Sequence, residues 1–401
     1  MSRKVCLLLC SLLILVLAAC GGEQAPETIQ IGAVVPISGS LAGGGGQVER
    51  GYQIAVEDIN AAGGIYVKEF DKKIPIELTL LDDESDPNKL VTLLESLNSD
   101  QKVVAYLGGF GSGQHAAAAA IAEKNKIPYI GVAFALYAPH GQGYKYLFSP
   151  FPKSQDMASD IFAMLNEYLP EGERPTRVAV FQEQTDWGVE LGDLWREQAA
   201  AQGYEIVVYE EYSVGSSDFT DIILKAKEAD AELLLSLPTP PDGITIQRQM
   251  AELDYTPKFQ FTIRAPDVPT WKDLGEAGDY VALAPGWFYG MAYDGVAELN
   301  EKHMEMTDRP ADPIVGPAYA AVQILADAIE RAGSLDRDAI RDAIAATDMD
   351  TVVGPVTFRE DGTGVVNAPI LQYQHGTIEL IYPSEFATAE MIYPIPPVSE
   401  R

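Results

Sequence analysis

Two consecutive series of alternating apolar and amphipathic segments constrain the fold of this chain more than any other feature. In the first series, residues 28–132, short apolar runs such as 29–35 and 103–107 alternate with segments that have helical spacing. The second series begins after Pro150 and Pro152. Strands that alternate with helices are typical of parallel sheets covered by helices on both faces. We therefore predict an α/β protein with two lobes, each built on a doubly wound parallel sheet.

The expected strands are short runs of mainly apolar residues, at 29–35, 74–81, 103–107, 128–132, 178–181, 206–209, 232–237 and 259–263. The expected helices show apolar residues on one face, at 48–59, 88–97, 116–123, 155–168, 187–201, 218–228, 243–253, 318–332 and 337–346. The glycine run 43–46 is expected to form a loop that leads into the first helix. A strand at 353–358 and a hairpin at 370–382 follow, and we expect the proline-rich tail, 384–401, to be loosely held.

Residues 1–20 have the features of an export signal that ends in a lipid-attachment site. Arg3 and Lys4 precede an apolar run at 5–17 that is short for a membrane-spanning helix. The run ends in Leu-Ala-Ala-Cys20, which is typical of a bacterial lipoprotein, and residues 21–27 have the composition of a flexible tether. We predict that Cys20 carries the lipid and anchors an extracytoplasmic protein to the membrane. The alternative is an ordinary cleaved signal with a chance cysteine.

Charge and cysteine content exclude several classes of function. The formal net charge is −31, which argues against nucleic acid as a partner and leaves the lipid anchor as the only expected membrane contact. Of the three cysteines, Cys6 and Cys10 lie within the predicted signal and Cys20 is the predicted lipid site. The mature chain is therefore expected to have no disulfide, no thiolate metal site and no cysteine nucleophile.

Several short strings, in order along the chain, carry a resemblance to a known family. They are Ile31–Gly39, Glu57–Ile65, Asp82–Pro87, Asp186–Gly188, Asp218–Thr220, Ala332–Ser334 and Gly354–Phe358 with Gly362. Through them the chain resembles the branched-chain amino-acid type of periplasmic solute-binding protein, the receptor subunit of an ABC importer. The most specific string is Glu-Asp-Ile-Asn-Ala-Ala-Gly-Gly-Ile at 57–65.

The resemblance implies two α/β lobes joined by a three-strand hinge, with the ligand held in the cleft between them. The first lobe would comprise 28–150 plus 287–352, the second 151–286 plus 353–383. Closure about the hinge would enclose the ligand. The implied partners are a small-molecule carboxylate and the ABC permease and ATPase subunits. We expect a monomer that needs no cofactor and is not an enzyme.

The first lobe offers its expected ligand contacts at the ends of two strands. The glycine-rich segment 108–113 follows one strand and opens a helix, where backbone N–H groups and the Ser112 hydroxyl can hold a carboxylate. The resemblance assigns Ser112 this role and adds Gly113 and the backbone of Ala133 and Ala135. A threonine or serine is usual at 135, so one hydroxyl contact is missing. The alternative for Ser112 is a simple helix cap.

The second lobe departs further from the family. Trp187 stands where a tyrosine packs on the ligand, with first-turn core as its alternative role. Arg264 stands where a glutamate pairs with the ligand's ammonium group, and a guanidinium would repel an ammonium and attract an anion. The alternative for Arg264 is a structural salt bridge. A tyrosine in the first loop is replaced by the glycines near Gly44, which would open space. The expected aromatic walls are Phe110, Phe134, Trp187 and Trp287.

These departures favour an organic, aromatic or 2-oxo acid as the ligand. Amino-acid binding of the leucine, isoleucine and valine type stays open as the alternative, because Asp186, Asp242 or Asp267 are close enough in sequence to pair with Arg264 or with an ammonium. A sensory ligand-binding module on the same fold is a further alternative.

The residue spacing does not match the motifs of dinucleotide sites, hydrolases or metal sites. The glycines at 111 and 113 lack the acidic residue that a dinucleotide site needs about twenty positions later. Ser112 and His115 do not form a hydrolase elbow, because Phe110 and Gln114 occupy its glycine positions. The four histidines lack metal-ligand spacing, and the acidic run 82–86 lacks the calcium-loop pattern.

Overall fold

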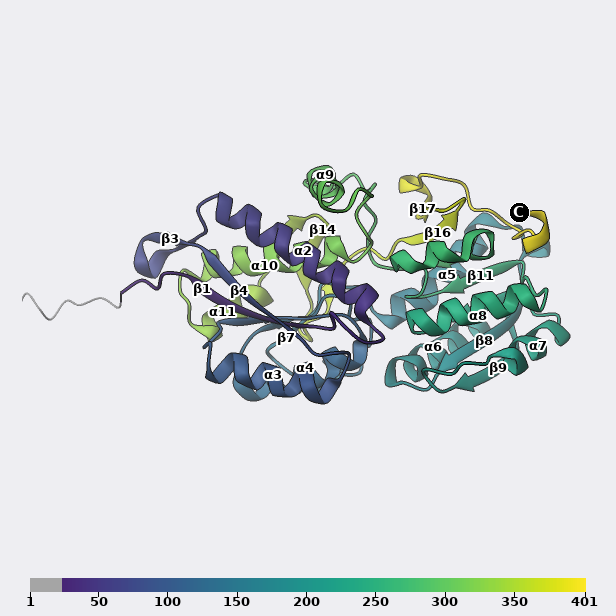
Figure 1. The fold of residues 1–401 in the computed structure, drawn as a ribbon, viewed down its shortest axis with the longest axis horizontal. Coiled ribbons are helices and arrows are strands. Elements are labelled where there is room, and N and C mark those ends of the chain that lie inside the picture. The colour runs from purple at the N-terminus through teal and green to yellow at the C-terminus, as the bar shows by residue number, and fades with distance from the viewer. Residues whose placement is uncertain (1–23) are drawn as a thin grey trace, which may run out of the picture.

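The computed structural model describes residues 24–401. The predicted signal and its lipid-attachment residue, Cys20, lie outside the described residues. Two α/β lobes lie side by side, with the N-terminal strands and helices in one and β8–β11 in the other (Figure 1). The predicted fold class is confirmed. None of the helices within 24–401 combines the length and the apolar character needed to cross a membrane.

The first lobe is built on a five-stranded parallel sheet with the order β4-β1-β5-β6-β7. Its strands are β1 (Ile29–Val35), β4 (Ile76–Asp82), β5 (Ala105–Leu107), β6 (Tyr129–Ile130) and β7 (Leu147–Phe148). Its helices are α2 (Ala42–Ala61), α3 (Pro87–Ser99), α4 (Ser112–Asn125), α10 (Val315–Ala332) and α11 (Arg337–Ala345). β1 is almost entirely buried because it lies inside the sheet with neighbours on both sides, which explains its continuous apolar run.

The glycine run is helical, so the predicted loop at 43–46 is wrong. α2 begins at Ala42 and contains all four glycines. A side chain at Gly45 would collide with the Pro36 carbonyl, and one at Gly44 would collide with the ring of Phe110. The glycines therefore allow close approach of neighbouring groups to the first turn of α2.

The second lobe is built on a seven-stranded sheet with the order β17-β16-β12-β11-β10-β8-β9. Its parallel strands are β8 (Arg177–Glu183), β9 (Glu205–Tyr212), β10 (Leu233–Ser236), β11 (Phe259–Thr262) and β12 (Ala282–Leu283). Its helices are α5 (Ser154–Tyr168), α6 (Asp186–Gln202), α7 (Thr220–Glu228) and α8 (Pro240–Glu252). Pro240 at the first position of α8 and the Thr239 side chain, which accepts from Asp242 N, fix where that helix begins.

The predicted terminal hairpin extends this sheet. β16 (Ile370–Gln374) pairs antiparallel with β12 and with β17 (Thr377–Tyr382). The tail that follows is not loosely held, contrary to the prediction. The buried Gln372 side chain donates to Ile392 O at 3.1 Å and accepts from Ile392 N at 2.9 Å. The Gln372 amide thus pairs with both the N–H and the carbonyl of Ile392 and fixes the tail against the hairpin.

The chain crosses between the lobes after β7, after β12 and before β16 (Figure 1). A three-stranded sheet comes before the last crossover, formed by β13 (Asp348–Thr351), β14 (Gly354–Phe358) and β15 (Gly364–Val365). Ser149 and Thr363 form a bridge, which places β14 and β15 beside the end of β7 in the first lobe. The third crossover therefore follows β15, later than the expected boundary at 352/353. The remaining elements are α9 (Val296–Thr307) and the hairpin of β2 (Ile65–Val67) and β3 (Lys72–Ile74).

Candidate functional site

The strand order reverses at one point in each sheet, and these two points face each other. In the first lobe the reversal lies between β1 and β5, and in the second between β8 and β10. Ligands of such sheets bind where the loops after these strands diverge. A cleft of about 440 Å³ opens there between the lobes. Its lining comes from both: Ser40, Leu41, Ser85, Pro87, Gly111, Ser112, Gly113, Gln114, Glu183, Gln184, Thr185, Asp186, Trp187, Val214, Thr239 and Arg264.

Helix N-termini converge on this cleft. The lining includes the first residues, or the residues just before them, of α2, α3, α4, α6 and α8. Each contributes backbone N–H groups without helical partners and the positive end of a dipole, so the cleft favours an anionic group. At α4 the Ser112 Oγ accepts from Leu136 N at 3.3 Å, which leaves its proton available for a ligand oxygen. Gly113 beside it is exposed to the cleft.

A small apolar recess continues inward from the cleft and shares Gly111, Trp187 and Arg264 with it. Its remaining lining is Phe110, Ala133, Phe151, Met157, Ile263, Asp267, Ala284, Pro285 and Ile314. The recess measures about 20 Å³, room for one water molecule. A ligand side chain can therefore enter only when the lobes part or the walls move.

Arg264 is paired inside its own lobe. Its Nη2 donates to Glu183 Oε2 at 2.6 Å, its Nε donates to Pro238 O at 3.0 Å, and its guanidinium lies 5.3 Å from the centre of the Trp187 ring. Burial raises the pKa of the Glu183 carboxyl, and the guanidinium opposes that shift. The contact at 2.6 Å is a charge-assisted hydrogen bond between two buried side chains. The salt bridge that was the alternative for Arg264 is present, with Glu183 at the end of β8 as its partner.

Asp267 is the acid among the residues that line the recess, and it forms no salt bridge with any residue in 24–401. Its side chain is 4% exposed, and among the residues of the structure, 24–401, no hydrogen-bond partner reaches its Oδ1. Burial raises the pKa of Asp267 to about 8, although the Arg264 guanidinium lowers it in part. Buried polar atoms without a partner are uncommon in folded proteins, so this oxygen marks a candidate ligand contact.

The structure brings together six of the nine predicted ligand contacts: Phe110, Ser112, Gly113, Ala133, Trp187 and Arg264. The other three serve the interior. Phe134 packs between His115 and His140, with ring centroids at 4.7 and 5.3 Å. The Ala135 carbonyl accepts from Ser154 N at 3.0 Å and from its Oγ at 3.1 Å.

Trp287 is fully buried and donates from Nε1 to Val352 O at 2.8 Å. The large aromatic-walled pocket is therefore absent from the described part of the chain. The ring of Phe110 occupies the space over Gly44 that the glycine run was expected to open.

Hydrogen bonds link the two lobes across the cleft. Glu190 of α6 accepts from Tyr137 N at 2.8 Å and from Ala138 N at 2.9 Å, both in the first lobe. Gln47 of α2 donates to Asp267 O at 2.7 Å. These bonds join the two lobes at two separate places, at Glu190 and at Gln47.

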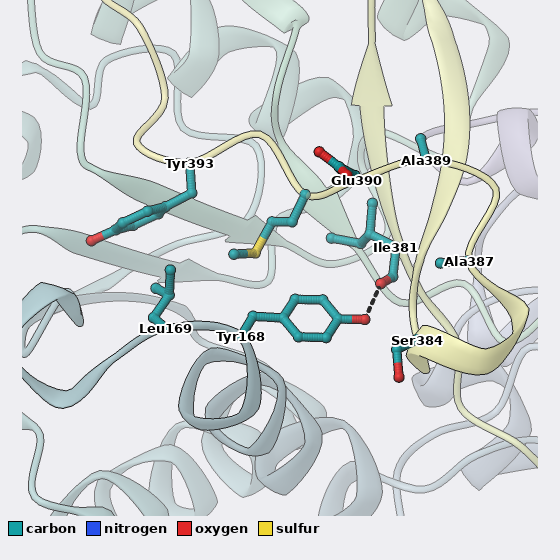
Figure 2. A pocket seen from close by; sticks show the side chains of 9 residues that line it. Tyr168, Leu169, Ile381, Ser384, Ala387, Ala389, Glu390 and Tyr393 are labelled. Atoms are coloured by element: carbon teal, nitrogen blue, oxygen red, sulfur yellow. Dashed lines mark hydrogen bonds between the residues drawn. The ribbon is translucent and has the colours of Figure 1, made fainter.

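A separate pocket of about 370 Å³ lies within the second lobe (Figure 2). The end of α5, strand β17 and the C-terminal tail surround it, and Tyr168 Oη donates to Ile381 O at 2.6 Å across it. Its walls come from one lobe, so closure cannot enclose a ligand there.

Sequence reasoning missed Glu183, Glu190 and Gln47 and named Asp267 only as one of three acids. One signal was present: Glu183 is an acid at the carboxyl end of an apolar strand, where sheets of this kind present functional side chains. The bonds of Gln47 join residues more than two hundred positions apart, and no local pattern predicts them.

Comparison with known proteins identifies the family. A profile described as "Periplasmic binding protein" matches residues 28–377. The chain belongs to the periplasmic binding protein family. The predicted resemblance is thereby confirmed, and membership places the binding domain outside the cytoplasm. Among curated relatives, Leu/Ile/Val-binding protein homolog 7 of Brucella suis is 23% identical over 392 residues, 93% of this chain and 96% of that protein.

Solved members of the periplasmic binding protein family share the fold. A leucine binding protein from Thermotoga maritima superposes with a TM-score of 0.79 at 23% identity, covering 89% of this chain and 100% of that one. A branched-chain amino acid binding protein from Streptococcus pneumoniae in complex with isoleucine superposes with a TM-score of 0.77 at 24% identity, covering 92% of this chain and 100% of that one. A solute binding protein from R. palustris in complex with benzoate superposes with a TM-score of 0.77 at 16% identity, covering 91% of this chain and 98% of that one.

Proposed function

We propose that this protein is the receptor of an ABC importer for an amino acid with an apolar side chain. The observation that carries the proposal is Asp267, a buried carboxyl at the wall of the recess with an unpartnered oxygen. An α-ammonium would satisfy this oxygen and compensate its charge. The names of the relatives, Leu/Ile/Val-binding and leucine binding proteins, support the same class.

The other parts of the site suit such a ligand. The convergent helix N-termini and the Ser112 hydroxyl would hold its α-carboxylate. The recess, lined by Phe110, Phe151, Met157 and Ile263, has room for one water molecule and would receive an aliphatic side chain once its walls move apart. The Arg264 guanidinium would repel the ligand's ammonium only weakly, because the Glu183 carboxyl lies 2.6 Å from the guanidinium and balances its charge. The physical reason to favour an organic acid is therefore removed.

An organic acid without an ammonium remains the second candidate, supported by the benzoate complex of the R. palustris neighbour. In that case Asp267 would stay protonated and donate its proton to the ligand. The two candidates make opposite demands on one carboxyl, so an isosteric substitution separates them.

The test is calorimetric binding of L-leucine, 4-methyl-2-oxopentanoate and benzoate to the wild type and to Asp267→Asn. Leucine and 4-methyl-2-oxopentanoate share a side chain and differ at the ammonium. We expect leucine to bind the wild type. Its affinity for Asp267→Asn should be lower by roughly thirtyfold or more, the loss typical of removing one partner of a buried charge pair. Leucine binding that is unchanged in Asp267→Asn, or tight binding of only the two acids, would contradict the proposal.

A further inference from the structure

Gln47 is a polar residue outside the binding cleft that lines none of the cavities described above. It lies in the first turns of α2, the helix that begins at the boundary with the second lobe (Figure 1), and its side chain is 0% exposed. A fully buried amide must satisfy two donors and one acceptor inside the protein. The partners it uses show its role.

The amide of Gln47 is fully used by three backbone groups. Nε2 donates to Gly43 O at 3.3 Å within α2 and to Asp267 O at 2.7 Å. Oε1 accepts from Ile314 N at 3.0 Å, at the start of α10. Asp267 belongs to the second lobe, whereas Gln47 and Ile314 belong to the first. One side chain therefore joins both lobes directly behind the recess, where Asp267 and Ile314 form two of the walls.

We infer that Gln47 is a positioning residue that couples closure of the lobes to presentation of the Asp267 carboxyl. The role of Asp267 as the ligand contact rests on the proposed function, whereas the bond from Gln47 goes to the Asp267 backbone and is independent of that side chain. The bond joins the two lobes, so it must break when they part. It therefore stabilises the closed state alone and slows ligand escape.

The chemistry of an amide is required at this position. Methionine has a similar length but would leave Asp267 O and Ile314 N buried without partners, which is costly. Glutamate keeps the acceptor for Ile314 N but cannot donate to Asp267 O when ionised. Both changes remove the link between the lobes without touching the ligand.

The test is stopped-flow measurement of L-leucine dissociation from Gln47→Met and Gln47→Glu, with Gln53→Met as the matched control. Gln53 lies on the same helix and is exposed. We expect dissociation to be faster by about tenfold in both Gln47 variants, with association changed by less than about threefold. Gln53→Met should behave as the wild type. A role in folding alone would lower the melting temperature and leave the dissociation rate of the folded protein unchanged.

Two outcomes are decisive and separable. A dissociation rate in Gln47→Met equal to that in Gln53→Met overturns the inference about Gln47. If Gln47→Met does not fold, the same comparison with Gln47→Glu decides. Unchanged leucine affinity in Asp267→Asn instead overturns the proposed amino-acid function. If the wild type does not bind leucine, the dissociation experiment is run with 4-methyl-2-oxopentanoate as the probe.

Discussion

The guanidinium of Arg264 lies 2.6 Å from the carboxylate of Glu183, and both side chains are buried, at 8% and 1% exposure. This pair changes the electrostatics of the cleft. The sequence favours an Arg264 guanidinium that repels an ammonium, with a structural salt bridge as the alternative. In the structure it pairs with Glu183 within the second lobe. Among the residues that line the recess, Asp267 is the one with a buried side-chain oxygen that lacks a hydrogen-bond partner in residues 24–401.

Removing one partner of this pair should destabilise the protein. Glu183→Gln leaves the Arg264 guanidinium buried beside a neutral amide, and we expect the free energy of unfolding to fall by about 3 kcal/mol in urea denaturation. Asp193→Asn is the control, because its pair with Arg196 is 3.0 Å long but largely exposed. We expect that variant to change stability by less than about 1 kcal/mol. Equal effects of the two substitutions would contradict the assigned role of the Arg264–Glu183 pair.

The Asp267 carboxyl should make stability depend on pH in a defined direction. Its pKa is raised to about 8 in the folded ligand-free protein, whereas in the unfolded chain it is about 3.9. Between these values the folded state binds more protons, so its contribution to stability falls as pH rises. Asp267→Asn removes this dependence. The unfolding free energy of the variant, relative to the wild type, should increase by about 1.4 kcal/mol per pH unit between about pH 5 and 7.

The control for this measurement is Asp254→Asn, at an exposed position in the same lobe. If the unfolding free energies of the wild type and Asp267→Asn change with pH in the same way across this range, the pKa of the Asp267 carboxyl is not raised and the prediction is wrong.

Two glycines of α2 should respond in opposite ways to alanine. A methyl group at Gly44 collides with the ring of Phe110, whereas the nearest atom to one at Gly46 is Arg50 Nη1 at 3.4 Å. We expect Gly44→Ala to destabilise the protein by about 1–3 kcal/mol through overpacking. Gly46→Ala should stabilise it by up to about 1 kcal/mol through helix propensity. Thermal denaturation of both variants checks the assignment, and a stabilised Gly44→Ala would show that Phe110 does not occupy that space.

The lipid anchor stays a prediction from the N-terminal sequence. The apolar run that ends in Leu-Ala-Ala-Cys20 predicts that Cys20→Ala blocks lipid attachment. We expect the variant to lose lipid labelling and to shift from the membrane fraction to the soluble or unprocessed fraction. Labelling with a palmitate analogue and fractionation measure this. Equal labelling and equal membrane association of the variant would refute the lipoprotein assignment.

The order of secondary structure could be predicted because each strand and helix has a local pattern. The run at 29–35 has the apolar continuity of a buried parallel strand, and β1 has the same bounds. The helical state of the glycines in α2 cannot be predicted locally, because their low helix propensity is a local property, while the close approach of Phe110 and Pro36 that requires them is tertiary. The same holds for the C-terminal tail, because its attachment depends on Gln372, a residue of β16.

The site could be predicted only in outline. Ser112 and Trp187 lie at helix starts that the strand–helix order places at the cleft. The state of Arg264 could not be predicted, because its partner Glu183 is 81 residues away. The burial of Phe134 and Trp287 depends on how the first lobe packs, and aromatic residues in both a pocket and a core look alike in sequence.

The proton balance of ligand binding tests the central claim most directly. If Asp267 is protonated in the free receptor and ionises to pair with an ammonium, binding of L-leucine at pH 7 should release about 0.9 proton per ligand, given a free pKa of about 8. Calorimetric titrations in buffers of different ionisation enthalpy measure this number. We predict close to one proton for the wild type and none for Asp267→Asn where binding persists. Binding of leucine to the wild type without proton release would contradict the account.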